Sequence, residues 1–324
     1  MCSLYDRKIR MIIKVILILA FVVSGVADED APVQSHENRV LIIGFSRDVF
    51  ADVHIPDALA AMKVWASELT RNRGVAGSVE TKVFENLVQA SDAIMNHAVD
   101  LIILTTSEYL KIPARSEIEP YFVHTRNGKI LEESLILVHS QSGINNLSDL
   151  KGKQIILMNH ARTSAGKIWL ESLILEDGYK NLEDFFANVQ VVDKSSKTVL
   201  PVYFKQKDAC LIHRGGFDMI SELNPQLRRE LKILVVSPAT TPSVTCIRSD
   251  FDPELKNILI DALGNLHNEP RGQQILLLFK VDALESFKAS FLDGTRQLIE
   301  KHYLLLQGTD RVNFFKESGK TAGR

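Results

Sequence analysis

The sequence predicts an α/β protein with two lobes, a hinge and a cleft between the lobes. Short apolar runs that suit buried strands alternate with amphipathic helical segments over most of the 324 residues. Such alternation is typical of parallel sheets covered by helices on both faces. Extended segments near residues 121–134 and 237–245 interrupt it. Two interruptions indicate that the chain crosses twice between two α/β units.

The first unit alternates strand and helix from its start. Runs of apolar residues predict strands at 40–45, 79–84 and 101–104. Helices are predicted at 57–69 and 87–97, where apolar residues recur at helical spacing. Ligands of parallel sheets bind at the carboxyl ends of the strands. The residues that follow each strand are therefore expected to face the cleft.

The middle of the chain departs from this alternation. Two strands, at 121–125 and 134–139, flank a turn at Asn127-Gly128. A second α/β unit follows, with strands at 154–158, 189–192, 209–212 and 231–236 and helices at 168–175, 198–204 and 217–223. After the proline-containing stretch 237–242, the sequence predicts a strand at 244–248 and helices at 253–267, 271–278 and 292–305.

These elements predict the extent of each lobe. Lobe 1 is expected to comprise residues 38–125 together with 240–306, and lobe 2 residues 130–236. The polar segment 307–324 is expected to form a flexible tail.

The N-terminus has the features of a signal peptide over residues 1–27. Basic side chains precede and enter an apolar run at 12–23, small residues follow at 25–27, and an acidic stretch follows at 28–30. The apolar run is short for a membrane span, although an uncleaved anchor is the alternative. Translation could start at Met1 or at Met11. We therefore expect an exported, periplasmic protein.

Charge argues against nucleic acid as a partner. The formal net charge is −2, and loss of residues 1–27 removes four cationic side chains and one carboxylate, which lowers it to −5. No large basic cluster is evident in the sequence. We expect a monomer that binds a small molecule.

Two cysteines remain after the expected cleavage. Cys210 and Cys246 each fall in a predicted buried strand. They could pair after export, or they could stay as two separate buried thiols, which is the interpretation that we favour. Spacing in the sequence does not give the distance between them.

The segment 149–178 holds the strongest candidate for a ligand site. Gly152 marks a turn, a short apolar strand follows, and the polar loop 159–164 carries Arg162, Thr163 and Ser164. An amphipathic helix then runs to Gly178. Free N–H groups at a helix start, beside hydroxyls and an arginine, suit an anion.

Several short sequence segments together resemble those of the phosphate/phosphite/phosphonate-type substrate-binding proteins of ABC importers. They are DLKGK at 149–153 with Thr163-Ser164 opening a helix, DACLI at 208–212, RSDFDP at 248–253, ILIDALGNLH at 258–267, PRGQQI at 270–275 and FKVD at 279–282. The resemblance covers about residues 39–300. It implies the type II periplasmic-binding-protein fold, in which two lobes close around a ligand.

The resemblance also implies roles for individual residues. Thr163 and Ser164, with the Ala165 amide, would hold anionic oxygens. Tyr109 would line the cleft from lobe 1, and Ser46, beside Phe45 at the end of the first strand, would face the same cleft.

The chain departs from the family pattern in two places. Where phosphonate binders often have a histidine, this chain has Ser196-Lys197. Where aminophosphonate binders have an acidic group, it has His213-Arg214. Ligands that carry an amine are therefore disfavoured, and Lys197, His213 and Arg214 become candidate contacts.

Each candidate also has a plain structural interpretation. Arg162, Lys197 and Arg214 could be solvated, Thr163 and Ser164 could only cap the helix, and Tyr109 could belong to the core. His160 has no second ligand at metal spacing, so no metal site is predicted. Gly166-Lys167 lacks the rest of a phosphate-binding loop, and no serine stands in a nucleophile elbow. The sequence predicts neither an enzyme nor a cofactor.

The sequence thus predicts an exported solute-binding protein that captures a small anion, phosphonate-like or another oxyanion, for an ABC permease in the membrane. An alternative is a ligand-binding input protein for a membrane sensor kinase. An enzyme on the same fold is a third and weaker alternative.

Overall fold

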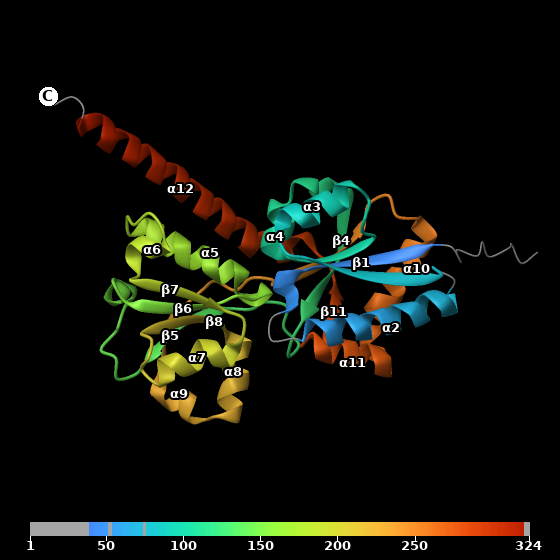
Figure 1. The fold of residues 1–324 in the computed structure, drawn as a ribbon, viewed down its shortest axis with the longest axis horizontal. Helices are drawn as coiled ribbons and strands as arrows, with labels where there is room; N and C mark the ends of the chain where they lie inside the picture. The colour runs from blue at the N-terminus through green and yellow to red at the C-terminus, as the bar shows by residue number, and fades with distance from the viewer. Residues whose placement is uncertain (1–38, 51–53, 74–75, 321–324) are drawn as a thin grey trace, which may run out of the picture.

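The computed structural model describes residues 39–50, 54–73 and 76–320. They form two lobes, each built around one β-sheet, with helices on both faces of each sheet (Figure 1). The expected signal peptide lies outside the described residues. Within the described ranges, no helix combines the length and apolar character that a membrane span requires.

Lobe 1 contains a six-stranded sheet in the order β11-β4-β10-β3-β1-β2. The strands are β1 (Val40–Ser46), β2 (Ser78–Phe84), β3 (Leu101–Thr105), β4 (Ile118–Thr125), β10 (Ser243–Arg248) and β11 (Ala283–Ser286). β1 pairs in parallel with β2 and β3, whereas β10 runs antiparallel to β3 and β4. The mixed sheet thus places strands from both ends of the chain in one lobe.

Helices cover the two faces of this sheet and bury separate apolar clusters. One face packs against α2 (Ile55–Arg73), α10 (Pro253–Gly264) and α11 (Pro270–Leu278). The other face packs against α3 (Leu87–Met95) and α4 (Thr106–Lys111). Because β3 is buried on both faces, all five of its residues are buried, which explains its continuously apolar sequence.

Lobe 2 contains a five-stranded sheet in the order β7-β6-β8-β5-β9. The strands are β5 (Ser134–His139), β6 (Gln154–Met158), β7 (Asn188–Val192), β8 (Ala209–His213) and β9 (Leu231–Val236). The covering helices are α5 (Ala161–Glu176) and α6 (Leu182–Phe185) on one face and α7 (Ser195–Tyr203), α8 (Arg214–Leu223) and α9 (Gln226–Glu230) on the other. β6 is parallel to β7 and β8, and β5 is antiparallel to β8 and β9.

Short 3-10 helices complete the described elements. They are η1 (Arg47–Phe50), η2 (Pro113–Glu117), η3 (Leu147–Leu150), η4 (Leu266–Asn268) and η5 (Ala289–Leu292).

The chain passes between the lobes after β4 and again before β10. Asn127 and Gly128 have positive φ angles of 49° and 67°, as a tight turn requires. The strands on either side of this turn do not form a hairpin, because β4 belongs to the sheet of lobe 1 and β5 to that of lobe 2. The two crossing segments pair with each other through Glu132 and Thr240, with both N–O distances at 2.9 Å. This pairing holds the hinge together.

Several elements differ from those that the sequence predicts. The short elements α4, α6, α9 and β11 were not predicted. α5 begins at Ala161, earlier than expected, because His160 caps it by accepting a hydrogen bond from Arg162 N–H at 2.9 Å. Residues 161–164 therefore form the first helical turn rather than a loop.

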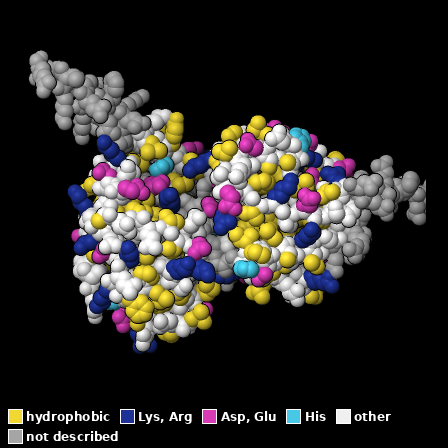
Figure 2. Space-filling view, viewed as in Figure 1, with side chains coloured by type: hydrophobic (Ala, Val, Ile, Leu, Met, Phe, Trp, Pro, Cys, Tyr) yellow, Lys and Arg dark blue, Asp and Glu magenta, His cyan; other side chains and the backbone are white. Residues whose placement is uncertain are grey.

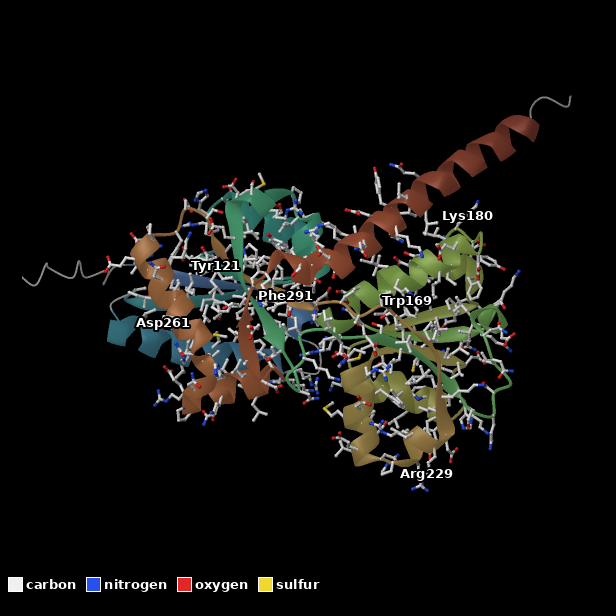
Figure 3. The ribbon with its side chains drawn as sticks, turned by 180° about the vertical axis from the view of Figure 1, so that it is seen from behind. Tyr121, Trp169, Lys180, Arg229, Asp261 and Phe291 are labelled. Atoms are coloured by element: carbon white, nitrogen blue, oxygen red, sulfur yellow. The ribbon has the colours of Figure 1, made fainter. Side chains whose placement is uncertain are left out.

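The last helix, α12 (Asp293–Lys320), differs from its predicted extent and surroundings. It continues beyond residue 306, although we expected a flexible tail there. Leu298 and Ile299 pack against the lobe 2 cluster, whereas the sequence placed this segment with lobe 1. Figure 3 shows α12 running along α5, which carries the labelled Trp169. The helix thus connects the two lobes by direct packing.

Cys210 and Cys246 are two free, buried thiols. Cys210 lies on β8 in lobe 2 and Cys246 on β10 in lobe 1. This confirms the interpretation of two separate thiols.

Gly166 permits the close approach of α5 to β5. A Cβ atom at this position would lie 2.0 Å from Ser134 Oγ and 2.4 Å from Ser134 Cβ. Gly166→Ala is therefore expected to lower the free energy of unfolding by about 1–3 kcal/mol, the usual cost of overpacking. Gly264→Ala is the control, because its nearest contact would be 3.7 Å. There we expect little loss, or a small gain from helix propensity. Urea denaturation of both variants tests this contrast, and equal losses would contradict it.

Candidate ligand-binding site

Two helix starts meet where the lobes face each other. α4 follows the carboxyl end of β3 in lobe 1, and α5 follows the carboxyl end of β6 in lobe 2. The hydroxyl Oγ atoms of Ser107 on α4 and Ser164 on α5 lie 2.8 Å apart. This is the strand edge at which α/β proteins bind ligands. Charged side chains of both signs gather along the boundary between the lobes in Figure 2.

A second polar contact spans the lobes close to the end of β1. Asn159 Nδ2 donates to Asp48 Oδ1 at 3.3 Å. Ser46, which is 2% exposed, donates from Oγ to Glu108 Oε1 at 2.7 Å. Burial raises the pKa of Glu108, against the lowering effect of its hydrogen bonds. Ser46 thus lies near the cleft, with its hydroxyl proton directed to a carboxylate of its own lobe.

Arg162 and Glu132 form a buried ion pair between the start of α5 and the hinge. Arg162 Nη1 lies 3.3 Å from Glu132 Oε2, and the side chains are 8% and 12% exposed. Arg162 Nη2 also donates to the carbonyl of Lys280 in lobe 1, at 3.2 Å. The guanidinium therefore links lobe 2, the hinge and lobe 1.

Glu132 has further neighbours in lobe 2. Its Oε1 accepts from Gly215 N–H at 3.1 Å, and its Oε2 lies 3.6 Å from His213 Nδ1. Burial alone would raise the pKa of Glu132, but His213, Arg162 and the Gly215 N–H outweigh it and lower the pKa to about 2. His213 Nδ1 already accepts from Gly216 N–H at 2.9 Å, and burial lowers the pKa of His213. Arg162 is thus the permanently charged partner of Glu132.

A cavity of ≈ 80 Å³ reaches from this region into lobe 1. His160, Ala161 and Arg162 line its lobe 2 end, and apolar side chains of β1, β3, α2, α10 and α11 line the rest. The rings of Phe45 and Phe279, which both line it, are stacked with centroids 5.7 Å apart.

One wall of the cavity carries a half-buried polar group. His124 Nδ1 lies 2.9 Å from Ser243 Oγ, and His124 Nε2 lies 3.0 Å from Thr245 Oγ1. Burial, with a smaller effect from Arg162, lowers the pKa of His124 to about 4. The ring is therefore neutral near pH 7, and both of its nitrogens have partners.

The structure brings together some of the residues that the sequence singled out. Arg162, Ser164 and His213 lie near the interlobe boundary, and Ser46 lies beside it across Glu108. Thr163 is 1% exposed, and its hydroxyl donates to the carbonyls of Met158 and His160. Its hydroxyl therefore stabilises the start of α5 from within lobe 2.

Other candidates lie in different surroundings. Ala165 packs in the lobe 2 cluster and Tyr109 in a lobe 1 cluster, where burial raises the pKa of the phenol. Lys197 is on α7, with its side chain 62% exposed and 4.0 Å from Asp193. Arg214 pairs with Glu133 at 2.5 Å. Ligand contact by any of these residues stays a prediction.

Four residues of this region were not identified as candidates from the sequence: Ser107, His124, Glu132 and His160. Ser107 could have been identified from the sequence, because three successive hydroxyl residues, Thr105-Thr106-Ser107, follow a predicted buried strand. Glu132 could not, since a single carboxylate in a polar crossing segment looks like a solvated residue. Within the described ranges, no three His, Cys, Asp or Glu side chains are grouped so as to hold a metal ion.

Comparison with protein families gives a match over most of the chain. Residues 54–291 match the family model described as "ABC transporter, phosphonate, periplasmic substrate-binding protein". The chain belongs to this family. It is thus a phosphonate-type periplasmic substrate-binding protein of ABC importers. Members of the family bind a small ligand and work with a membrane permease; they are transport binding proteins rather than enzymes.

Solved structures confirm the type II periplasmic-binding-protein fold. XAC2383 of Xanthomonas citri, bound to chloride, matches with a TM-score of 0.66 and 19% identity over 83% of this chain and 99% of that one. A binding protein component of an ABC phosphonate transporter from Pseudomonas aeruginosa matches with a TM-score of 0.61 and 14% identity, over 88% of this chain and 99% of that one. PhnD1 of Prochlorococcus marinus, in complex with methylphosphonate, matches with a TM-score of 0.59 and 16% identity, over 81% of this chain and 97% of that one. At these identities the matches establish the fold of this family member.

Proposed function

We propose that this protein captures a small oxyanion between its lobes and presents it to the membrane permease. The observation that carries the proposal is the contact of Ser107 and Ser164, two hydroxyls from different lobes that lie 2.8 Å apart. Ser164 Oγ also donates to the Ala161 carbonyl at 2.9 Å. Each hydroxyl can rotate away from its present partner and donate to an oxygen of a ligand that lies beside the pair. A ligand held by both would bridge the lobes.

Positive charge at this boundary favours an anion. α5 is 16 residues long, so its N-terminus carries a partial positive charge. Burial lowers the pKa of His160 at that end, and the nearby His213, Arg162, Lys280 and Arg126 lower it further. Three of these groups, Arg126, Arg162 and Lys280, are permanent cations, and they face the two carboxylates of Glu132 and Asp282. The local field therefore favours a ligand with anionic oxygens.

Binding of such a ligand would favour the closed arrangement of the lobes. A ligand that contacts Ser107 and Ser164 at once gains both hydrogen bonds only when the lobes are together. The crossing segments paired through Glu132 and Thr240 are the hinge about which the lobes would separate. The permease would then distinguish loaded from empty protein by the closed shape.

A thermal-shift screen of the purified protein tests this proposal. The panel contains phosphate, phosphite, methylphosphonate, sulfonates and carboxylates, with cationic compounds as controls. A bound oxyanion at a hundred times its Kd adds about 2.7 kcal/mol to stability. Because hydrogen bonds to charged groups contribute about 1.5–3 kcal/mol, Ser107→Ala and Ser164→Ala should each weaken binding roughly ten- to a hundredfold.

Ser290→Ala is the matched control, because Ser290 is exposed and lies on η5, outside this region. It should leave the affinity unchanged. Stabilisation by a cationic or neutral compound alone, or affinity that is unaffected in both cleft variants, would overturn the proposal.

A further inference from the structure

The contact between Asp48 and Asn159 joins the lobes away from the hinge. Asp48 lies on η1, which directly follows β1 of lobe 1, and Asn159 directly follows β6 of lobe 2. The crossing segments join β4 and β10 of lobe 1 to β5 and β9 of lobe 2. β1 lies two strands from β10, and β6 lies two strands from β5. Since neighbouring strands are about 4.8 Å apart, the contact lies roughly 10 Å from the hinge strands in each lobe.

The distance from the hinge decides what this contact can do. When two lobes rotate about a hinge, groups near the axis separate little, whereas groups farther out separate in proportion to their distance from it. The pair of Arg162 and Glu132 includes the crossing segment itself, so it stabilises the hinge. The bond from Asn159 Nδ2 to Asp48 Oδ1 links the two lobes directly at 3.3 Å. It therefore breaks after a small opening.

Each partner is fixed to its own lobe by a backbone hydrogen bond. Asn159 N–H donates to the Val192 carbonyl at the end of β7, at 2.7 Å. Asp48 N–H donates to Ser46 Oγ at 3.3 Å, and Ser46 is 2% exposed. The two side chains can therefore meet with little further loss of conformational freedom. The ionised acceptor also makes the bond stronger than one between neutral groups.

We propose that Asp48 and Asn159 form a latch that holds the lobes closed over the ligand, and that both are positioning residues for ligand capture rather than ligand contacts. The inference goes beyond the proposed function, because it concerns closure and not the identity of the ligand. The fraction of molecules in the binding-competent state sets the apparent affinity. The latch therefore tightens the binding of any ligand that needs closed lobes and slows its release.

Single-molecule energy transfer between one dye on each lobe measures closure without a ligand. The dyes are attached at Val88→Cys on α3 of lobe 1 and at Leu223→Cys on α8 of lobe 2, where the side chains are 69% and 84% exposed. Cys210 and Cys246 are buried, so the dyes react at the two introduced positions. The purified full chain is used throughout.

Removal of either partner should open the lobes. Asp48→Ala and Asn159→Ala should each lower the ratio of closed to open molecules roughly three- to tenfold, the range expected for one hydrogen bond. Asn145→Ala is the matched control, because Asn145 Oδ1 accepts from Lys232 Nζ at 2.9 Å within lobe 2. It should leave the ratio unchanged. Equal ratios in the unmodified protein and both latch variants would overturn the proposal.

An exchange of the two side chains separates a latch from a loss of local structure. Asp48→Asn combined with Asn159→Asp places the amide on lobe 1 and the carboxylate on lobe 2, so the same bond can form in the opposite direction. The ratio of closed to open molecules should return towards that of the unmodified protein. If the exchanged variant stays as open as the single alanine variants, the latch is wrong.

Stopped-flow kinetics with methylphosphonate extend the test to capture. Asn159→Ala should speed dissociation roughly three- to tenfold and change the association rate little, because the ligand enters between open lobes. A change in association alone would contradict the latch. If methylphosphonate does not bind, the proposed function fails for this ligand, whereas the energy-transfer ratios still decide the latch. The two failures are therefore distinguishable.

Discussion

Replacement of Arg162 by methionine is expected to destabilise the protein by about 3–5 kcal/mol. The guanidinium is 8% exposed and faces Glu132, which is 12% exposed. Removing one partner of a buried ion pair leaves an uncompensated charge, and such changes typically cost this amount. The variant also loses the bond to the Lys280 carbonyl that links the lobes.

The electrostatic part of this loss of stability can be separated from the effect of lost packing. Methionine preserves much of the apolar volume of arginine, so the main change is electrostatic. Glu132→Gln alone leaves Arg162 without its anionic partner and should also destabilise. The double variant removes both charges, so its loss should be clearly smaller than the sum of the two single losses.

A matched exposed pair provides the control. Arg228 Nη2 lies 2.8 Å from Asp218 Oδ1, with side chains 51% and 39% exposed. Solvent screens such a pair, so Arg228→Met should cost at most about 1 kcal/mol. Urea denaturation at pH 7 measures all four variants. A loss in Arg162→Met no larger than that in Arg228→Met would show that the Arg162–Glu132 pair is not a buried charge pair.

The stability of the protein is expected to fall as the pH is lowered from about 6.5 to about 4. Burial lowers the pKa of His124 from 6.5 to about 4, so the unfolded chain binds a proton in this range before the folded chain does. The stabilisation is present above pH 6.5 and is lost as the pH falls through 4. Such a shift corresponds to about 3 kcal/mol. Burial lowers the pKa of His160 and His213 as well, so they act in the same direction.

The variant His124→Gln tests the contribution of this residue. Glutamine can bond a neighbouring hydroxyl but does not titrate, so the fall in unfolding free energy between pH 6.5 and 4 should be reduced by a comparable amount. His267→Gln, at an exposed histidine on η4, should leave the pH profile unchanged. An identical profile in His124→Gln and the unmodified protein would contradict this assignment.

Glu132 extends the acid sensitivity to lower pH. Its pKa of about 2 lies below the ordinary value of 4.5, so its stabilising effect is present above pH 4.5 and is lost as the pH falls towards 2. The same carboxylate that holds Arg162 at the cleft therefore adds to acid unfolding.

Local pattern was enough to predict most strands and helices. β5, β6 and β9 have the predicted bounds, because each is a short apolar run between polar or turn-forming residues. The helix start at Ala161 was harder, since it depends on the cap by His160. Histidine is not a usual N-cap residue.

The assignment of strands to sheets could not be predicted from the local sequence pattern. The turn at Asn127-Gly128 has the sequence of a hairpin turn, yet β4 and β5 join different sheets. Hairpin pairing is a local signal, whereas membership of a sheet depends on strands such as β10 and β8 that are distant in the chain. The packing of Leu298 against lobe 2 is equally non-local.

In the candidate site, too, local features could be predicted and long-range contacts could not. The hydroxyls and Arg162 at the start of α5 stand out in the sequence because the strand, the polar turn and the helix follow one another. The residues that they contact do not stand out. Ser107 is 57 residues from Ser164, and Glu132 is 30 residues from Arg162. Only the fold brings these pairs together, and Glu132 supplies a carboxylate beside His213 that the strand end itself lacks.

The central claim is that an oxyanion is held where the two lobes meet. The most direct measurement is a crystal structure of the protein with the oxyanion that stabilises it most in the thermal-shift screen. The claim predicts the anionic group beside Ser107 and Ser164 at the start of α5, with the hydroxyls of both lobes in contact with it. An anion bound elsewhere, or held by one lobe only, would contradict it.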